Sequence, residues 1–435
     1  MPAPSIAVVG AGLAGLRACE GLRGRGFEGR ITLIGDEAHP PYDRPPLSKQ
    51  FLAGDWDVGR VVLSPPDRLA SLDLDLRLGE SHRAVQLDVG ARRLSLASGE
   101  SVTFDGLVLA TGSAARRLPG VSGLPGTYVL RTLDDAVALR NVLTQPGARL
   151  VLAGAGFIGL EVAATARRLG AEVTVVEPLE VPLGRVLGPV TGGACEIMHR
   201  EEGVRFYLRT VIESVDAGAP DAPDAPDAPD AQPLRCRLSS GDTLECDAIL
   251  VGIGAAPSLG WLDGSGLAAG PDGIVCDASL LAGPGIVVAG DVARWPLPLH
   301  AEASGPAPAP AQALETIRVE HRTNAAEQGG YAAQTLLAHL GLAPAVTPTE
   351  EPSYAVPYVW SDQYNVKIQV LGLPRPDDEV VVVEGDPADR RFVALHGRGG
   401  RLVGVVGFAR PRHVMSLRPL LDRAASLEEA ASLFG

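Results

Sequence analysis

The stretch Ile6-Ala7-Val8-Val9-Gly10-Ala11-Gly12-Leu13-Ala14-Gly15 decides the fold of this chain, because an apolar strand runs directly into a glycine loop and then into a helix. In this spacing, Gly10 permits a tight turn, Gly12 lets the backbone approach a pyrophosphate, and Gly15 lets the helix pack closely on the strand. The amides at the start of the helix would face the phosphates. The stretch therefore predicts a dinucleotide-binding unit.

An acidic partner for this loop follows at the expected distance. A second apolar strand, residues 31–34, ends in Gly35-Asp36-Glu37, about 20 residues beyond the glycine loop, where such units place a carboxylate on the ribose hydroxyls. Asp36 is the first choice because it lies closest to the strand end, and Glu37 is its neighbour. Without further evidence, however, the glycines could equally serve an ordinary turn.

The same pattern recurs in the middle of the chain. An apolar run, residues 150–153, leads into Gly154-Ala155-Gly156-Phe157-Ile158-Gly159, and the strand at residues 173–176 ends in Glu177. Two complete units in one chain leave little room for the turn-only interpretation. We therefore expect two bound dinucleotides, a resident flavin and a visiting nicotinamide, because hydride chemistry needs a donor and an acceptor.

Composition narrows the remaining possibilities. The 435 residues suggest about three domains, and a hydrophobic content of 46% supplies sizeable cores. The sequence shows no leader pattern and no apolar run of membrane-spanning length, so we expect a cytoplasmic protein without a membrane partner. The net charge of −14 argues against nucleic acid as a partner.

Cysteine and lysine are both scarce. The five cysteines have neither C-x-x-C nor zinc-ligand spacing, so we expect buried small side chains and no metal site. Lys49 and Lys367 are the only lysines among 38 basic residues. Because arginine replaces lysine almost everywhere else, Lys49 is expected to serve a chemical purpose that needs an ammonium group. The alternative is that it is retained by chance.

The proline-rich segment before Lys49 carries a family resemblance. The run His39-Pro40-Pro41-Tyr42-Asp43-Arg44-Pro45-Pro46-Leu47-Ser48-Lys49, the two glycine loops and the later Gly290-Asp291 together resemble the FAD-dependent ferredoxin reductases of bacterial cytochrome P450 and Rieske oxygenase systems. The resemblance covers nearly the whole chain. It implies an α/β fold with two Rossmann-like dinucleotide-binding domains, for FAD and NAD, plus a small C-terminal α+β domain.

The resemblance also implies roles for single residues. Arg44 and Pro45 would lie along the flavin, and Lys49 would lie near flavin N5. Glu161 would pair with Lys49, which makes these two the expected catalytic residues. The alternatives are a solvated loop for the segment and, for Glu161, an acid favoured by the helix dipole in the first turn.

The full set of residues expected to bind the cofactors combines the glycine loops with positions implied by the resemblance. The set is Gly10, Gly12, Leu13, Ala14, Gly15, Asp36, Glu37, Arg44, Pro45, Lys49, Ala84, Ala110, Thr111, Gly112, Arg131, Gly154, Gly156, Phe157, Ile158, Gly159, Glu161, Glu177, Arg185, Ile253, Gly254, Gly290, Asp291 and Trp360. Several have plain alternatives: Arg131 as a surface charge, Asp291 as a helix cap and Trp360 as a core aromatic.

The expected domain boundaries follow from these motifs. An FAD-binding domain would comprise residues 1–115 and 254–330, and an NAD-binding domain residues 116–253. Within the latter, the Ala-Pro-Asp run at 217–233 should form a disordered loop. Residues 331–435 would form the small C-terminal domain, with short strands beginning at about Tyr331.

The expected function is transfer of hydride from NADH to FAD, followed by single-electron transfer to a small [2Fe-2S] ferredoxin. No basic residue directly follows Glu177, which favours NADH over NADPH; the alternative is that Arg185, a little later in the chain, reaches a 2′-phosphate. The competing interpretations are an NADH oxidase or diaphorase and a redox-sensing flavoprotein of the apoptosis-inducing-factor type. The oligomeric state could be monomer or homodimer.

The sequence departs from the family pattern at two positions. Arg322 stands where the family usually has Trp, and Val359 replaces a usual Phe within the segment that resembles an aromatic loop over the flavin. An acidic ferredoxin would need a basic patch for docking, and Arg322, Arg410 and Arg412 are candidates.

Overall fold

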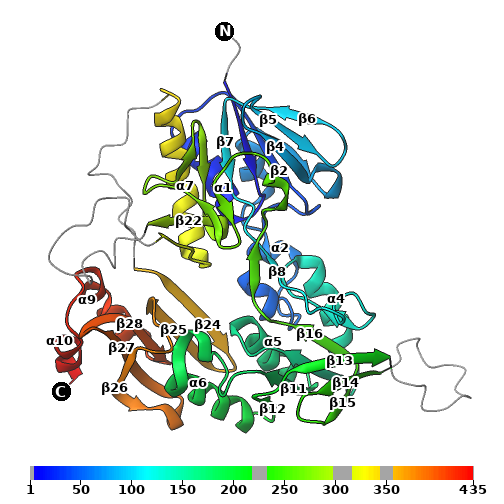
Figure 1. Cartoon of the computed structure of the whole chain (residues 1–435), viewed down its shortest axis with the longest axis vertical. Coiled ribbons are helices and arrows are strands. Elements are labelled where there is room, and N and C mark those ends of the chain that lie inside the picture. The colour runs from blue at the N-terminus through cyan, green and yellow to red at the C-terminus, as the bar shows by residue number, and fades with distance from the viewer. Residues whose placement is uncertain (1–3, 218–232, 297–315, 343–355, 435) are drawn as a thin grey trace, which may run out of the picture. The chain divides into compact units, whose positions relative to one another are not determined.

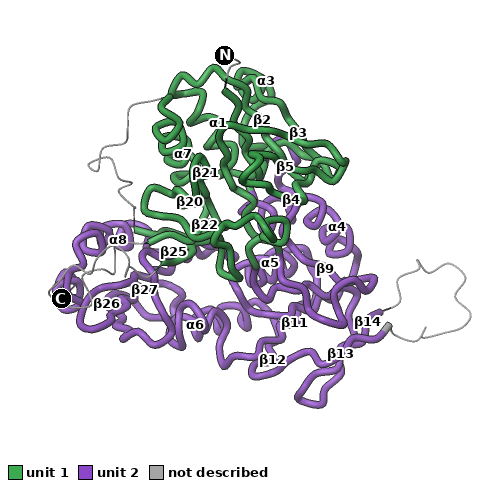
Figure 2. The backbone as a smooth tube through the Cα atoms, turned by 45° about the horizontal axis from the view of Figure 1, so that its top comes forward, with its two compact units in different colours: residues 1–43, 62–114, 256–359 green, residues 44–61, 115–255, 360–435 purple. Residues whose placement is uncertain are grey.

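The computed structural model describes residues 4–217, 233–296, 316–342 and 356–434. Within it the chain divides into two compact units, shown in separate colours in Figure 2. Unit 1 comprises residues 1–43, 62–114 and 256–359, and unit 2 comprises residues 44–61, 115–255 and 360–435. The Ala-Pro-Asp run, except its end residues, and the Ala/Pro-rich spacer at 303–313 lie outside the described residues.

Unit 1 is built on a six-stranded sheet in the order β20-β21-β7-β1-β2-β3. Its strands are β1 (Ser5–Val9), β2 (Arg30–Gly35), β3 (Leu74–Leu78), β7 (Gly106–Leu109), β20 (Leu281–Gly283) and β21 (Ile286–Val288). All neighbours are parallel except β20 and β21. Strand β1 is buried on both faces, which explains its continuous apolar run. Its Val8 pairs with Leu33 of β2 on one side and with Val108 of β7 on the other.

Helices α1 (Leu13–Gly24) and α7 (Arg322–His339) lie side by side in unit 1 (Figure 1). Gly329 allows this close contact, since a Cβ there would lie 2.3 Å from the carbonyl oxygen of Ala14. The expectation of strands from about Tyr331 is wrong, because α7 continues to His339. Its buried Ala333 and Leu337 recur at helical spacing and belong to the core of unit 1.

The remaining elements of unit 1 are short. They are α3 (Pro66–Ser71), η2 (Glu80–His82), β4 (Ala84–Asp88), β5 (Arg93–Leu96), β6 (Ser101–Thr103), η3 (Gly260–Leu262), β18 (Ala269–Gly270), β19 (Gly273–Val275), η4 (Gly290–Val292), β22 (Ala293–Pro296) and β23 (Thr316–Ile317). Strands β4, β5 and β6 form an antiparallel sheet. Strands β18, β19, β22 and β23 form a mixed sheet, in which β19 and β22 are parallel and the other neighbours antiparallel.

The second glycine loop belongs to a parallel five-stranded sheet in unit 2, in the order β12-β11-β10-β16-β9. Its strands are β9 (Thr127–Tyr128), β10 (Arg149–Ala153), β11 (Glu172–Glu177), β12 (Arg205–Leu208) and β16 (Ala248–Val251). The helical elements of this part are η1 (Pro45–Ser48), α2 (Val58–Val61), α4 (Leu133–Leu143), α5 (Phe157–Arg168) and α6 (Gly184–Glu201). An antiparallel sheet of β13 (Ile212–Ala217), β14 (Leu234–Leu238) and β15 (Thr243–Cys246) completes it.

The C-terminal part is a five-stranded sheet in the order β24-β25-β28-β27-β26, followed by short helices. Its elements are β24 (Tyr358–Gln363), β25 (Val366–Gly372), β26 (Glu379–Asp386), η8 (Pro387–Asp389), β27 (Arg391–Arg398), β28 (Arg401–Phe408), α8 (Pro411–Ser416), α9 (Arg418–Asp422), α10 (Leu427–Ala431) and η9 (Ser432–Phe434). The segment expected to form an aromatic loop is therefore a strand, β24, in which Ser361 and Gln363 alternate with more exposed neighbours and are buried.

The boundaries between the units at 114/115 and 255/256 fall within the paired strands β8 (Ser113–Ala115) and β17 (Ala255–Pro257), and further boundaries fall at 43/44, 61/62 and 359/360. The expected α/β architecture with two dinucleotide-binding folds and a small C-terminal α+β part is confirmed. Within the described ranges, no helix has the length and apolar character to cross a membrane.

Candidate functional site

The first glycine loop of unit 1 is shaped by close backbone contacts. Gly10 has φ +114°, and a Cβ there would lie 2.0 Å from the carbonyl oxygen of Ala110. A Cβ on Gly15 would lie 1.9 Å from the carbonyl oxygen of Gly10. Gly12, in contrast, faces open space and caps α1 without a side-chain hydrogen bond. The loop is thus a cradle whose free amides fit a pyrophosphate.

Two other predicted loops lie beside this cradle, at the carboxyl ends of β1, β7 and β21. The amide of Ala110 donates to the carbonyl oxygen of Val9 at 2.7 Å and so places the segment Ala110–Gly112 against the first strand. A Cβ on Gly290, which has φ +77°, would lie 3.0 Å from the Cβ of Ala14. Asp291 follows within η4. Ligands of open α/β sheets bind at this edge.

Gln328 on α7 is a residue that the sequence reasoning missed. Its Oε1 accepts the amide of Gly290 at 2.9 Å, and the side chain is only 3% exposed. Its Nε2 has no hydrogen-bond partner among the described residues. A buried donor without a partner beside a glycine cradle fits a polar ligand such as FAD. In the sequence, a single glutamine within a helix gives no sign that it contacts a cofactor.

The acidic candidates after β2 differ in their surroundings. Asp36, the first choice, is exposed, whereas Glu37 is half-buried and accepts a hydrogen bond from the hydroxyl of Tyr42. Ala84 is buried at the start of β4, in the antiparallel sheet. Leu13 and Ala14 open α1 beside the cradle. The structure thus brings the predicted loops of unit 1 together. Whether Asp36 or Glu37 binds the ribose stays a prediction.

The second glycine loop in unit 2 repeats the geometry of the first. Gly154 has φ +101°, and a Cβ there would lie 2.6 Å from the carbonyl oxygen of Gly252 and 3.5 Å from Cγ2 of Ile253. Gly156 faces nearly open space, with its nearest atom 3.9 Å away. The exposed Ile158 lies in the first turn of α5. This loop fits a second dinucleotide pyrophosphate.

Three further predicted residues flank this second loop. Phe157 is half-buried and begins α5, and Gly159 is buried two residues further, where a Cβ would lie 2.9 Å from the carbonyl oxygen of Gly154. Gly254, with φ +99°, follows β16 and Ile253. The carboxyl ends of β10 and β16 therefore bring most of the residues predicted to bind NAD together.

Glu177 has a structural task that the sequence reasoning missed. Its carboxylate is buried, with Oε2 accepting the amide of Ala155 at 2.7 Å and Oε1 accepting the amide of Leu179 at 3.0 Å. The carboxylate therefore ties the glycine loop to the turn after β11. Its contact with a ribose stays a prediction. Arg185 is exposed at the start of α6, a helix anchored to the loop by the amide of Leu183 on the carbonyl of Ala155 at 3.0 Å.

The structure places Lys49 and Glu161 together within unit 2. Lys49 Nζ lies 2.8 Å from Glu161 Oε2, and the side chains are 10% and 7% exposed. The hydroxyl of Ser48 also donates to Oε2, and that of Ser361 donates to Oε1 at 2.7 Å. Thr165, one turn after Glu161, donates to the carbonyl of Ser48 at 2.8 Å and holds η1 against α5. The result is a buried, fully hydrogen-bonded ion pair.

The other predicted residues of unit 2 lie around η1 and β24. Arg44 caps η1, and its Nη1 donates to the carbonyl of Arg131 at 2.5 Å. Arg131 is in turn fixed by its amide, which donates to Asp135 Oδ2 at 2.9 Å. Pro45 begins η1, and Trp360 is half-buried in β24. Arg44 and Arg131 are therefore neighbours through the backbone of Arg131.

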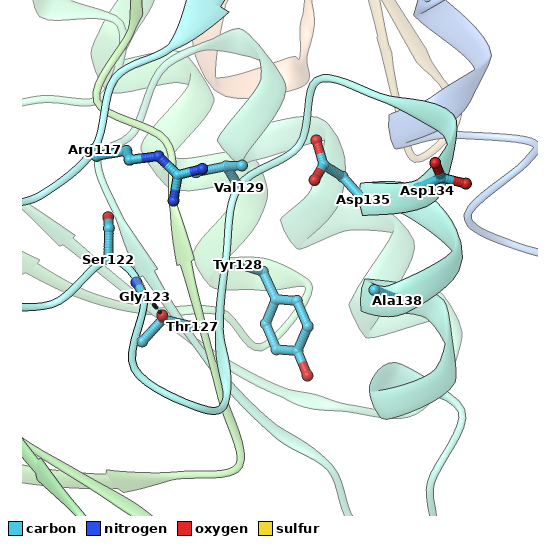
Figure 3. A pocket seen from close by; sticks show the side chains of 9 residues that line it. All are labelled: Arg117, Ser122, Gly123, Thr127, Tyr128, Val129, Asp134, Asp135 and Ala138. Atoms are coloured by element: carbon cyan, nitrogen blue, oxygen red, sulfur yellow. Dashed lines mark hydrogen bonds between the residues drawn. The ribbon is translucent and has the colours of Figure 1, made fainter. Parts of the chain in front are cut away.

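Unit 2 also has two surface pockets. Figure 3 shows one of about 340 Å³ beside β9 and the start of α4, lined by Tyr128, Asp134 and Arg117 among others; none of the predicted cofactor residues lines it. The other, of about 450 Å³, is lined by Lys49, Thr165, Arg167, Glu202 and Tyr364 among others. The second pocket therefore gives solvent a path to one side of the Lys49 ammonium.

All five cysteines are free and buried, as the sequence predicts. Burial raises the pKa of the Cys19 thiol to about 12 and that of Cys276 to about 12. Such thiols are poor nucleophiles at neutral pH. Across residues 4–217, 233–296, 316–342 and 356–434, no group of three or more His, Cys, Asp or Glu side chains is arranged to hold a metal.

The three arginines considered for partner docking differ in their pairing. Arg322 Nε lies 2.7 Å from Asp43 Oδ1, and Arg410 Nε lies 2.7 Å from Glu384 Oε1. Both charges are therefore partly neutralised. Arg412 is exposed at the start of α8 and has no partner in the described part of the chain.

Comparison with known proteins places these loops in a family. The family described as pyridine nucleotide-disulphide oxidoreductase matches residues 4–329, and a domain described as reductase C-terminal matches residues 358–433. Together the matches cover both glycine loops and the C-terminal sheet.

Individual relatives match over almost their whole length. Rhodocoxin reductase of Rhodococcus erythropolis is 36% identical over 432 residues, which cover 98% of this chain and 92% of the relative. The ferredoxin–NAD(+) reductase component of the biphenyl dioxygenase system of Paraburkholderia xenovorans is 36% identical over 392 residues, covering 90% of this chain and 86% of the relative. Among solved structures, putidaredoxin reductase in its covalent complex with putidaredoxin is similar with a TM-score of 0.84 and 30% identity, over 99% of this chain and 96% of that one.

Proposed function

The chain belongs to the pyridine nucleotide-disulphide oxidoreductase family, and from this premise we propose that it is an NADH-dependent ferredoxin reductase. It passes electrons through FAD to a small [2Fe-2S] ferredoxin that feeds a cytochrome P450 or Rieske-type oxygenase. The observation that carries the proposal is the buried Lys49–Glu161 pair in a chain with two open glycine cradles. The relative named as the ferredoxin–NAD(+) reductase component of the biphenyl dioxygenase system supports it.

The residues divide the task between two dinucleotide sites. Gly10, Gly12 and Gly15, with Gln328, would hold FAD, and the loop from Gly154 to Gly159 would hold NADH. When bound, FAD supplies a group that can take up two electrons together and release them one at a time. The proposed domains are FAD-binding (1–115 and 254–330), NAD-binding (116–253) and C-terminal (331–435).

Lys49 has the central place in this proposal. Its ammonium is held by Glu161 and supplies positive charge where negative charge develops during reduction. Because Glu161 accepts three hydrogen bonds, the ammonium is fixed before the reaction and needs little reorganisation. Disulfide chemistry is disfavoured, since all five cysteines are buried.

NADH is the proposed donor because Glu177 is buried against backbone amides and no basic residue directly follows it. Arg185 is the one nearby cation that could favour a 2′-phosphate. We expect Arg185→Ala to lower kcat/KM for NADPH severalfold while changing that for NADH less than about twofold. An equal loss with both donors would contradict this role.

The main test is anaerobic reduction of the FAD-loaded protein by NADH, followed by mixing with an oxidised [2Fe-2S] ferredoxin while flavin absorbance is recorded. Fast recovery supports the ferredoxin reductase. If flavin stays reduced against several such ferredoxins but recovers quickly in air, the protein is an NADH oxidase or diaphorase. If it stays reduced in both conditions, a redox sensor of the apoptosis-inducing-factor type is favoured.

The location and assembly complete the proposal. We place the protein in the cytoplasm, as a monomer or homodimer that meets NADH and a ferredoxin there. The charge of −14 makes a local basic residue such as Arg412 useful for contact with an acidic ferredoxin.

A further inference from the structure

A continuous line of polar side chains connects Glu161 with Tyr364 inside unit 2. Ser361 Oγ donates to Glu161 Oε1 at 2.7 Å, and Gln363 Nε2 donates to Ser361 Oγ at 3.0 Å. Gln363 Oε1 lies 2.9 Å from His199 Nε2, and the hydroxyl of Tyr364 lies 3.0 Å from His199 Nδ1. Ser361, Gln363 and His199 are fully buried. Sequence reasoning assigned no role to any of them except Glu161.

Residues of strand β24, of helix α6 and of the turn after β24 form this line. Ser361 and Gln363 are two residues apart on β24 and therefore share its buried face. His199 lies in the last turns of α6, with its ring edge-on to that of Tyr364 at a centroid distance of 5.0 Å. Tyr364 has φ +54° in the turn between β24 and β25, which aims it back toward the helix.

An ionised Glu161 fixes the direction of every hydrogen bond in the line. A carboxylate only accepts, so the single hydroxyl proton of Ser361 must go to Glu161. Ser361 Oγ then accepts from the Gln363 amide group, which leaves Gln363 Oε1 facing His199. His199 must therefore carry its proton on Nε2, and its bare Nδ1 accepts from Tyr364.

We propose that His199 and Gln363 are positioning residues for the Lys49–Glu161 pair. Through Ser361 they hold one oxygen of Glu161 so that its other oxygen presents Lys49 at a fixed place. The role of the pair at the flavin rests on the proposed function, whereas the hydrogen-bond line itself does not. Lys49, the partner of Glu161 at one end of the line, and Tyr364 at the other end both line the 450 Å³ pocket.

The position of Lys49 depends on the line for a simple reason. Glu161 is held by Lys49, Ser48 and Ser361, and among the described residues Ser361 is the hydrogen-bond partner of Oε1. If Ser361 loses the donor from Gln363, its hydroxyl is free to turn, and the carboxylate is no longer fixed at that oxygen. Small displacements of a reacting or charge-stabilising group slow catalysis strongly.

His199 is suited to a fixed, one-directional role. Burial lowers its pKa to about 4, despite the hydrogen bond with Gln363 that acts in the opposite direction. The groups that face it are Gln363 and Tyr364 from the C-terminal sheet, with Arg390 and Glu202 nearby. At neutral pH the ring is therefore neutral and holds a single tautomer.

The first test is nitrogen NMR on the FAD-loaded protein labelled with ¹⁵N-histidine, with His199 assigned by the loss of its signals in His199→Gln. We expect a protonated Nε2 and a bare Nδ1, and we expect Tyr364→Phe to shift the Nδ1 resonance. The opposite tautomer, or a ring charged at pH 7, would overturn the proposal. This measurement does not depend on what the protein reduces.

The second test compares two variants of matched size by stopped-flow reduction of the bound FAD with NADH. Gln at position 199 can still donate to Gln363, whereas Met cannot. We expect His199→Met to slow reduction about fivefold to tenfold, the size of one lost hydrogen bond to a charged network, and His199→Gln to remain within about twofold of the wild type. Gln363→Met should match His199→Met and replaces it if that variant does not fold.

The double variant separates positioning from a general effect on the fold. In a Glu161→Gln background, His199→Met should cause little further slowing, because the carboxylate that the line orients is gone. Equal rates in His199→Gln and His199→Met, or an undiminished effect in the Glu161→Gln background, would overturn the proposal. If NADH fails to reduce the wild-type flavin, the proposed function fails, and the tautomer measurement still decides on the line.

Discussion

At the scale of single residues, the arrangement around Glu161 determines what each neighbour contributes. The carboxylate is buried and holds Lys49, Ser48 and Ser361. Burial of two opposite charges is costly, and the attraction between them offsets that cost only while both are present. Removing one partner should therefore harm the protein more than removing both.

We expect Lys49→Met to lower the free energy of unfolding by about 3 kcal/mol, because it leaves an unpaired buried carboxylate. Glu161→Gln combined with Lys49→Met should recover most of this loss, since the neutral amide needs no cation. The measurement is the urea midpoint of each variant at pH 7.5. Additive losses in the double variant would show that Lys49 and Glu161 do not interact as described.

The sequence allowed some of these residues to be predicted and not others. Lys49 stood out because lysine is so rare here, and Glu161 followed from a family resemblance. Gln328, His199 and Gln363 could not be foreseen, since each gains its meaning from a partner far away in the chain. Glu177 was expected at a ribose; not foreseen was its structural task, in which it accepts the amide of Ala155 in the glycine loop and that of Leu179 in the turn after β11.

At the scale of elements, the glycine loops were predictable because backbone geometry demands glycine there. Gly10 and Gly15 admit no Cβ next to the backbone, whereas Gly12 faces free space. The continuation of α7 beyond about Tyr331 was not predicted, because the buried face of this part of the helix is completed by α1, which lies far away in the sequence. Packing between α7 and α1 therefore determines how far this helix extends.

This difference between the glycines leads to a second prediction. Gly12→Ala should leave folding nearly unchanged but weaken FAD binding about tenfold or more, because the added methyl group takes space in the cradle. Gly15→Ala should instead reduce folded yield. FAD affinity by fluorescence titration and circular dichroism distinguish the two. Gly24→Ala, at an open position at the end of α1, is the matched control and should affect neither.

The strands on either side of the Ala-Pro-Asp run give a third prediction. Ala217 at the end of β13 pairs with Leu234 at the start of β14, so a short turn can join them. Replacing residues 219–231 by a turn of a few residues should raise stability by about 1 kcal/mol, through the smaller entropy of loop closure. NADH oxidation with ferricyanide should stay within about twofold. A lost fold would mean that the run contributes more than a connection.

At the scale of the whole molecule, the predicted family and the α/β fold class are confirmed, and the proposed function agrees with the named relatives. Fold class was accessible because two strand–loop–helix patterns repeat and the C-terminal part changes to antiparallel strands. The division into two compact units was not accessible, since Arg44–Val61 and residues 360–435 join unit 2 through contacts that no local pattern records.

Three histidines, the buried His199 and His396 and the half-buried His321, link the stability of the whole chain to pH. Burial lowers the pKa of His199, His321 and His396 to about 4 each. In an unfolded chain the pKa is about 6.5, so the unfolded state binds protons first as the pH falls. The stabilisation is complete above pH 6.5 and is lost between pH 6.5 and 4, by about 1.4 kcal/mol per pH unit for each histidine.

His396 offers the clearest test of this linkage. Neither of its ring nitrogens has a hydrogen-bond partner in the part of the chain that the structure describes. Its Nδ1 lies 3.8 Å from Asp378 Oδ2, and this is not an ion pair at neutral pH because the ring is neutral there. We expect His396→Leu to preserve or raise stability at pH 7.5 and to reduce the decline between pH 6.5 and 4.5 by about 2–3 kcal/mol, which is about 1.4 kcal/mol per pH unit over that range. Urea midpoints at four pH values measure the decline, and the exposed His339→Gln is the control that should leave it unchanged. An unaltered decline in His396→Leu would mean that this ring does not remain neutral in the folded protein.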